Sequence, residues 1–228
     1  GWTPLMQAIH SNDSLLVNEL LAAGADVNQN SAIGSALSVA LDKGNKATIQ
    51  LLLERQINVN LSDADDTTPL MIAAGKGYAD ITATLIKQGA TLNARSLRGF
   101  SAVYIAIAKN HADISAMLIE KDAEIEIAVT DFGRQNVTPL MRAAQNGNPK
   151  IVGQLLTGGA DVNKTMDDGS SALMLAAQNG HLPVVKLLVE HGAKISAANH
   201  AGITPMSLAK TNAFKQIENY LTKMSKGK

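Results

Sequence analysis

Residues 169–199 read GSSALMLAAQNGHLPVVKLLVEHGAKISAAN, and this stretch decides the fold because it recurs along the chain. Ser171 is a residue type that accepts hydrogen bonds from the free N–H groups opening a helix, and small apolar residues follow it. The Gly180-His181 pair interrupts this run. A second run then has apolar residues at helical spacing and stops before Gly192, as at a helix C-cap. The unit therefore predicts a helix, a break, a second helix and an extended connection.

The same pattern returns roughly every 33 residues. Its opening Thr or Ser, followed by a small residue or Pro and then an apolar residue, occurs at Thr3, Ser35, Thr68, Ser101, Thr138, Ser171 and Thr204. Its closing segment reads GADVN at residues 24–28 and 159–163, and GATLN at residues 89–93. The chain thus resembles the ankyrin-repeat family over almost its whole length. This resemblance implies an all-α solenoid of about seven repeats, each a helix-turn-helix with a β-hairpin or finger loop.

We predict a single ankyrin-repeat domain over residues 1–222. The repeats are placed near residues 1–30, 31–63, 64–96, 97–129, 134–166 and 167–199, with a terminal cap at residues 200–222. The cap mixes polar residues into its second helix, as a terminal repeat with a solvated outer face requires. The basic segment 223–228 is predicted to be disordered. Because Gly1 lies inside a repeat, we expect a trimmed N-terminus, with the missing part or a partner covering the first repeat.

Composition narrows the function. The 228 residues carry a formal net charge of zero, which argues against a general polyanion binder, although a local basic patch stays possible. The chain has no cysteine, so disulfides and cysteine-based catalysis are excluded. This composition suits the cytoplasm, our default expectation, as well as the periplasm or secretion. No apolar run approaches the length of a membrane-spanning helix.

Motifs for catalysis are missing from the sequence. It has no phosphate-binding loop of the Walker type, no G-x-S-x-G and no H-E-x-x-H. His111 and His181 fall in the break between two helices, where ankyrin histidines typically tie the loop by hydrogen bonds. The acidic turns at residues 63–66 and 167–168 lack the ligand spacing of a calcium loop. We therefore predict no catalytic residue, no metal and no cofactor.

The resemblance also suggests where a partner would bind, because ankyrin proteins usually meet partners on the concave side, at the fingers and the ends of the first helices. At the helix ends, Lys43, Lys76 and Lys109 recur at intervals of 33 residues. Packed helices lie about 8–10 Å apart, so these lysines are expected to form a basic ladder that suits an acidic segment. The alternative is that they are simply solvated.

Aromatic residues give a second set of contacts. Trp2 and Phe100 precede the opening Thr or Ser, although Trp2 could instead cover the open face of the first repeat. The finger at residues 127–137, IAVTDFGRQNV, is longer than the others, and long loops are often functional. The complete set of predicted partner-binding residues is Trp2, Lys43, Thr67, Lys76, Arg98, Phe100, Lys109, Phe132, Arg134, Gln145, Asn146, Gln178 and Asn179.

These observations favour a non-catalytic, monomeric module that binds a protein partner, as a scaffold, an adaptor or an inhibitor of a partner enzyme. One alternative is a targeting domain of a longer enzyme or secreted effector. A less favoured alternative is nucleic-acid binding through the lysine ladder, which would weaken steeply with salt. The divergence between repeats resembles that of bacterial ankyrin proteins.

Overall fold

The computed structural model describes residues 1–226, which form fourteen α-helices and one two-stranded sheet. The helices follow one another in seven pairs, which confirms the predicted all-α repeat array. Contacts between residues group the chain into two compact units, Gly1–Ala106 and Ile107–Lys228, and the single domain over residues 1–222 stays a prediction. Helix α7 (Ala102–Ala108) crosses the border between them. Each unit is described by itself below.

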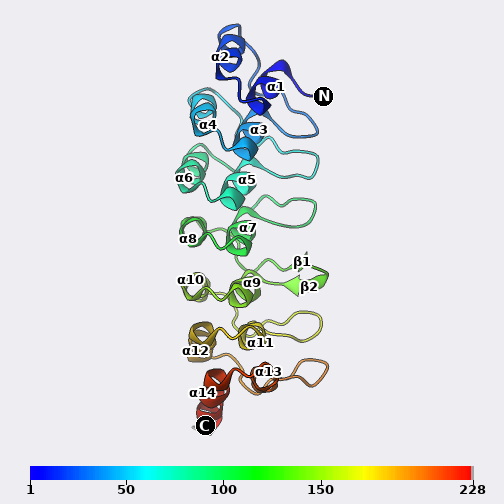
Figure 1. Cartoon of the computed structure of the whole chain (residues 1–228), viewed down its shortest axis with the longest axis vertical. Helices are drawn as coiled ribbons and strands as arrows, with labels where there is room; N and C mark the ends of the chain where they lie inside the picture. Colours follow the sequence, from blue (N-terminus) through cyan, green and yellow to red (C-terminus); the bar gives the residue numbers. More distant parts are fainter. Residues whose placement is uncertain (227–228) are drawn as a thin grey trace. The chain divides into compact units, whose positions relative to one another are not determined.

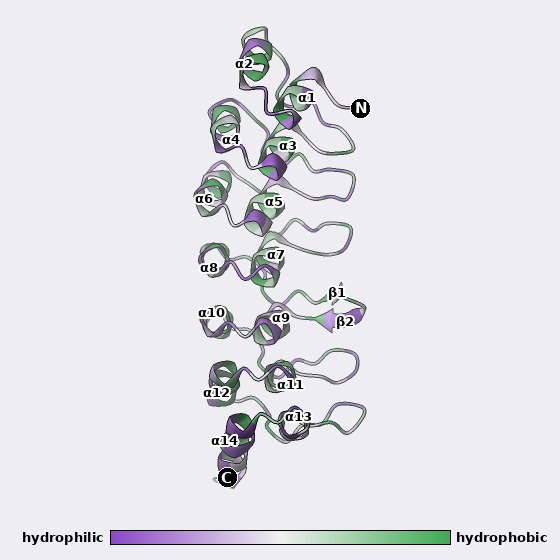
Figure 2. Cartoon of the chain, in the orientation of Figure 1, coloured by the Kyte–Doolittle hydropathy of each residue, from purple (hydrophilic) through white to green (hydrophobic). Residues whose placement is uncertain are grey.

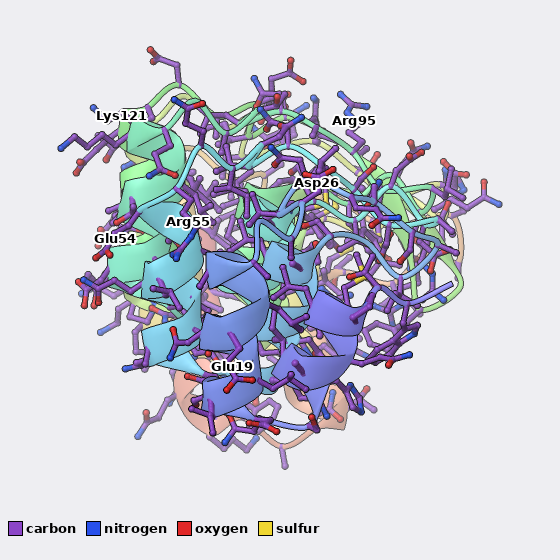
Figure 3. All side chains as sticks on the ribbon, turned by 90° about the horizontal axis from the view of Figure 1, so that it is seen from above. Glu19, Asp26, Glu54, Arg55, Arg95 and Lys121 are labelled. Atoms are coloured by element: carbon purple, nitrogen blue, oxygen red, sulfur yellow. The ribbon has the colours of Figure 1, made fainter. Side chains whose placement is uncertain are left out.

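Unit 1 contains three complete helix pairs. They are α1 (Pro4–His10) with α2 (Ser14–Ala22), α3 (Ala36–Lys43) with α4 (Lys46–Leu53), and α5 (Pro69–Lys76) with α6 (Ala79–Lys87). The first helices pack in a row, α1 on α3 and α3 on α5, with the second helices on one side and the fingers on the other (Figure 1). Figure 3 shows Glu19 of α2 and Glu54, which follows α4, on the outside of their helices.

Unit 2 repeats this arrangement. Its elements are α8 (Ala112–Glu120), β1 (Val129–Asp131), β2 (Arg134–Val137), α9 (Pro139–Asn146), α10 (Pro149–Thr157), α11 (Ala172–Gln178), α12 (Leu182–Glu190), α13 (Pro205–Thr211) and α14 (Lys215–Lys226). The first helices α9, α11 and α13 pack in sequence, and α8, α10, α12 and α14 form the second row (Figure 1). Hydrophobic residues are concentrated along the helices of both units (Figure 2).

Local sequence explains where the first helices begin. The hydroxyl of Thr3, Thr68 or Thr138 accepts a hydrogen bond from the backbone N–H three residues later, at 3.1, 3.3 and 3.2 Å. A proline follows each of these threonines at the first helical position, where its missing N–H costs nothing. The predicted role of Thr3 as a helix N-cap is therefore confirmed.

The asparagine that closes a repeat ties it to the next repeat. The Asn163 amide donates to the Gly192 carbonyl at 3.1 Å, and its side-chain oxygen accepts from the Lys194 N–H at 3.0 Å. Asn60 makes the same pair of bonds in unit 1, to the Gly89 carbonyl at 3.0 Å and from the Thr91 N–H at 2.8 Å. This motif therefore sets the spacing of successive fingers, because it satisfies two backbone groups of the following repeat.

Second helices begin at a residue whose side chain covers a glycine of the preceding repeat. The His181 ring lies against Gly147, the Phe214 ring against Gly180, and the Tyr78 hydroxyl against Gly44. His181 Nε2 also contacts the Gln145 carbonyl oxygen at 3.0 Å, so the predicted loop-tying role of this histidine is confirmed.

The C-terminal segment differs from the prediction. We predicted disorder from Lys223, but α14 continues to Lys226; residues 227 and 228 lie outside the described part. The helix persists because Ile217 and Leu221 are buried and anchor it. The Ser225 hydroxyl also donates to the Thr222 carbonyl at 2.9 Å.

Candidate functional site

The long finger of unit 2 folds into an antiparallel hairpin. Strands β1 and β2 pair Val129 with Val137 and Asp131 with Arg134, which leaves Phe132 and Gly133 as a two-residue turn. Both turn residues have positive φ, 47° at Phe132 and 76° at Gly133, and hairpin turns of this kind normally carry Asn or Gly. For a bulky side chain this backbone costs about 1–2 kcal/mol. Phe132 nevertheless stands there with its side chain 90% exposed.

A buried ion pair supports this turn. The Arg142 guanidinium of α9 donates to the Asp131 carboxylate of β1, and both residues are only 7% exposed. Its other terminal nitrogen donates to Gln145 Oε1 at 2.9 Å. The guanidinium carbon lies 5.1 Å from the centre of the Phe132 ring, within the range of a cation–π interaction. The exposed ring is thus held from below by a fixed cation.

Arg142 was missed by the sequence analysis, although the repeats carry a signal for it. The residue four positions after the opening Thr or Ser is Gln7, Val39, Ile72, Ile105, Leu175 or Leu208 in the other repeats. A cation at an otherwise mainly aliphatic position requires a buried partner, because an unpaired buried charge is very costly. The enlarged finger lies just before this repeat in the sequence, and Asp131 of that finger is the partner.

A hollow of about 270 Å³ lies beneath the hairpin, lined by Asp131, Phe132, Arg134, Val137, Arg142, Gln145, Met166 and Leu175. The hairpin also rests on the next finger, because the Asn136 amide donates to the Asp167 carboxylate. The Asp167 N–H reaches the Gln135 carbonyl oxygen at 3.4 Å. Three of the predicted contact residues, Phe132, Arg134 and Gln145, therefore meet at one place. This place offers an exposed ring, a half-open hollow with both polar and apolar walls, and the exposed cation of Arg134.

The predicted lysine ladder is only partly available. Lys76 Nζ lies 2.9 Å from Asp42 Oδ1 and 2.9 Å from the Asp42 carbonyl oxygen, so its charge is compensated within unit 1. Lys43 is exposed in the same unit. Lys109 is exposed in unit 2, so the ladder of all three lysines stays a prediction.

Two asparagine side chains at the ends of the first helices form hydrogen bonds to backbone carbonyl groups. The Asn146 amide donates to the Ile107 carbonyl at 3.0 Å, and the Asn179 amide donates to the Leu175 carbonyl at 2.7 Å. Both bonds satisfy carbonyl groups at the C-terminal end of a helix. Gln178 is exposed beside Asn179. These asparagines therefore have a structural role that the sequence analysis did not assign to them.

The remaining predicted residues belong to unit 1. Trp2 is 38% exposed, and its ring meets the His10 ring edge-on with centroids 4.5 Å apart. Phe100 is half-buried and stacks on Tyr104 with centroids 5.3 Å apart. The Thr67 N–H donates to Asp63 Oδ1 at 2.8 Å, and Arg98 is exposed next to Leu97. A role in binding stays a prediction for all four.

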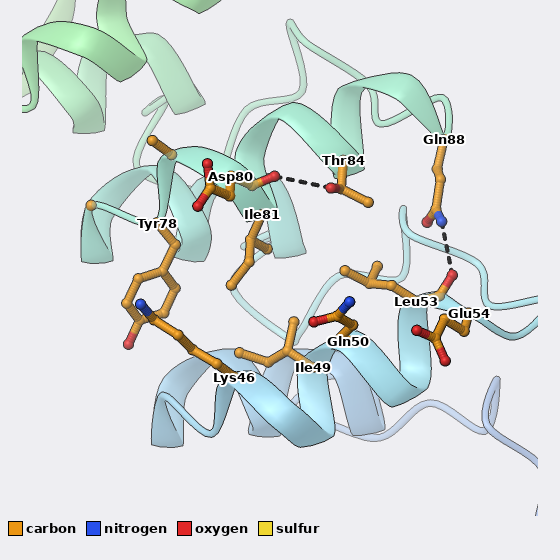
Figure 4. Close-up of a pocket in the computed structure, with 12 residues that line it drawn as sticks. Lys46, Ile49, Gln50, Leu53, Glu54, Tyr78, Asp80, Ile81, Thr84 and Gln88 are labelled. Atoms are coloured by element: carbon orange, nitrogen blue, oxygen red, sulfur yellow. Dashed lines mark hydrogen bonds between the residues drawn. The ribbon is translucent and has the colours of Figure 1, made fainter.

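A second hollow, of about 540 Å³, separates α4 from α6 (Figure 4). Its walls include Ile49 and Leu53 of α4 and Ile81 of α6, and Gln88 closes one end by donating to the Leu53 carbonyl at 2.8 Å. It is open because Thr84 is short. The same position holds Glu19, Leu51, Met117, Gln154, Leu187 or Tyr220 in the other repeats. Gln154, for example, bonds to Ser115 at 3.0 Å and so links α10 to α8.

Within residues 1–226, no three His, Cys, Asp or Glu side chains are arranged so that they could hold a metal ion. Over the same residues, every helix is too short or too polar to cross a bilayer.

A row of helix pairs with fingers on one side defines a repeat protein, and the comparisons identify the kind of repeat. The family model for three ankyrin repeats matches residues 37–131, 92–166 and 140–227, and the model for one ankyrin repeat matches residues 1–32. The chain therefore belongs to the ankyrin-repeat family, which confirms the predicted fold. Ankyrin repeats are in general protein–protein interaction modules and are typically non-catalytic.

Similar proteins share short stretches with this chain. Inversin of Canis lupus familiaris is 39% identical over 74 residues, which are 32% of this chain and 7% of inversin. The ankyrin repeat, SAM and basic leucine zipper domain-containing protein 1 of Notamacropus eugenii is 36% identical over 86 residues, 36% of this chain and 18% of that protein. A putative ankyrin repeat protein of fowlpox virus is 40% identical over 70 residues, 30% of this chain and 20% of that protein.

The chain thus aligns with at most a fifth of the length of these three relatives, which come from mammals and a virus. They do not support the bacterial origin that the divergence between repeats suggested.

Proposed function

We propose that this chain is a non-catalytic module that binds a protein partner with the surface around the β1–β2 hairpin, as a scaffold or as an inhibitor of a partner enzyme. One observation carries this proposal: Phe132 is 90% exposed, and its ring lies over the buried Arg142 guanidinium. Large apolar patches or anchors left in water typically mark interaction sites. A ring whose position is restrained before binding also loses less conformational entropy on binding.

Charge refines the choice of partner. Arg142 is neutralised by Asp131 and Lys76 by Asp42, so neither provides a free positive charge. Arg134 is exposed beside Phe132, on the rim of the hollow. The complement that we propose is therefore an apolar surface with an acidic group next to it. Such a charge at the rim improves specificity and association rate more than affinity.

The proposal is tested by affinity capture from an extract of the native host. Three baits are compared: the unchanged chain, Phe132→Ser and Leu97→Ser. Leu97 is the matched control because it is 69% exposed and lies on a fingertip of unit 1. We expect the unchanged chain and Leu97→Ser to retain the same proteins, and Phe132→Ser to lose them. If all three baits retain the same proteins, the binding surface is not at the hairpin.

The exposed Phe132 ring also agrees with the alternative that this chain is a targeting domain. Because the chain aligns with a small part of its relatives, a longer protein could use this surface to bring its other domains to the partner. The capture experiment, repeated with the complete reading frame, distinguishes the two cases. If the chain is a targeting domain, the complete protein should capture the same partner as this chain. An activity of its other domains should also depend on Phe132.

A further inference from the structure

We propose that the partner is a folded protein with an apolar pocket into which Phe132 inserts, and that Arg142 and Asp131 are positioning residues for this insertion. This inference rests on the proposed function and adds the kind of partner and the mode of contact.

The turn itself supports insertion. A two-residue turn with positive φ at both positions favours Asn, Asp or Gly at its first position, and none of these would present an apolar group. Phe132 occupies this position with φ of 47° and 90% exposure, so local structure does not account for it. A fully buried aromatic side chain removes roughly 150–250 Å² of surface from water. A protruding ring can bury this much surface only if a concave surface of the partner surrounds it. A flat surface or an extended peptide would leave most of the ring in water.

The ion pair supports positioning rather than stability. Buried ion pairs are weak contributors to stability and are often replaced by apolar residues without loss. The equivalent position is Leu175 or Leu208 in the two following repeats, so the array accepts leucine there. Arg142 instead joins the hairpin, through Asp131, to α9, and it lies 5.1 Å below the Phe132 ring.

The hairpin is also fixed at its base. Val129 and Val137 are 5% and 2% exposed, and the Asn136 amide donates to Asp167 of the next finger. The ring is therefore carried on a short, anchored arm. Such an arm is suited to a preformed pocket, because neither side has to order a loop during binding.

The mode of contact is tested by photocrosslinking. The photoreactive amino acid p-benzoylphenylalanine is placed at position 132. The controls carry it in place of Leu97 or Ile203, which are also exposed apolar residues. Each protein is irradiated in an extract of the native host. We expect position 132 to crosslink to a protein whose modified residues line an apolar pocket. Excess unchanged chain should suppress this crosslink. The Phe132→Ala variant should need an at least about tenfold higher concentration for the same suppression, as expected for loss of a hot-spot residue.

The outcomes separate this inference from the proposed function. If Phe132→Ala competes as well as the unchanged chain, or if the crosslinked residues lie on an extended segment, insertion is wrong although protein binding stands. If only the control positions crosslink, insertion is also wrong. If no position crosslinks to any protein, the proposed function fails as well.

The positioning role is tested with the double variant Asp131→Val/Arg142→Leu. We expect its unfolding midpoint to stay close to that of the unchanged chain, while hydrogen exchange at residues 129–137 becomes faster and partner affinity falls about tenfold. Arg142→Lys is the second variant, because lysine keeps the positive charge but lacks the planar guanidinium group. Its partner affinity should lie between that of the unchanged chain and that of the double variant. Unchanged hydrogen exchange and unchanged affinity in the double variant would show that the pair does not position the ring.

Discussion

At the scale of single residues, Gly147 is constrained by both its backbone and its neighbour. Its φ is +76°, and a Cβ at this position would overlap the His181 ring. Gly159 has a similar φ of +92° with nothing within 4 Å of a Cβ. A substitution at Gly159 therefore tests backbone strain alone, whereas a substitution at Gly147 adds steric overlap with His181.

We expect Gly159→Ala to lower the free energy of unfolding by about 1 kcal/mol, the cost of a left-handed backbone for an L side chain. Gly147→Ala should lower it by about 1–3 kcal/mol more, because the added methyl overpacks the contact with His181. Urea denaturation followed by circular dichroism measures both values. Equal losses for the two variants would show that the His181 ring simply moves away.

A second residue-scale prediction concerns pH. The hydrogen bond from Lys150 Nζ, 2.6 Å long, and the charge of Lys150 lower the pKa of Asp113 from its usual value. A carboxyl group with a lowered pKa stabilises the folded state above its unfolded pKa, and this contribution is lost as pH falls through the folded pKa. We expect Lys150→Met to raise the pKa of Asp113, as seen by NMR titration of its carboxyl carbon. An unchanged titration would mean that the pair does not persist in solution.

At the scale of elements, the hairpin departs from a local sequence preference at Phe132, whose φ is 47°. Asparagine fits a left-handed turn position better than phenylalanine does. We expect Phe132→Asn to leave the free energy of unfolding within about 0.5 kcal/mol, because relief of backbone strain offsets the lost cation–π contact. Partner binding should be lost in the same variant. Isothermal calorimetry with the captured partner and urea denaturation give the two values; a loss of about 2 kcal/mol in stability would make Phe132 a structural residue.

The helices and the hairpin differ in how far they could be predicted. Each first helix starts at a Thr or Ser and carries its own cap, so residues close in sequence suffice to predict it. The strands β1 and β2 are three and four residues long, and the buried Asp131 is paired with Arg142, which comes from α9. The sequence analysis predicted β-hairpin or finger loops and an enlarged finger with Phe132 and Arg134, but not the register of this hairpin or its ion pair.

At the scale of the whole molecule, charge balance argues against nucleic-acid binding. The chain has 20 basic and 20 acidic side chains, and Lys76 of the predicted ladder is already paired with Asp42. We expect no saturable binding of a fluorescent DNA duplex by anisotropy at about 50 mM salt, because the chain has no net positive charge to favour the release of counterions from DNA. Binding that weakens linearly with the logarithm of the salt concentration would contradict this expectation and favour the lysine ladder.

The sequence by itself determined the family, the number of repeats, the helix starts and the exposed aromatic of the long finger. All of these follow from a short pattern that recurs. One copy of the pattern is weak evidence for the fold, and its repetition at a fixed period makes that evidence strong. The tertiary structure alone decided which side chains are free to bind. Lys76 is paired, Asn146 caps a helix, and Arg142 is buried under Phe132, because each of them meets a group from another segment. Spacing along one chain does not specify such contacts, which depend on how successive repeats pack against one another.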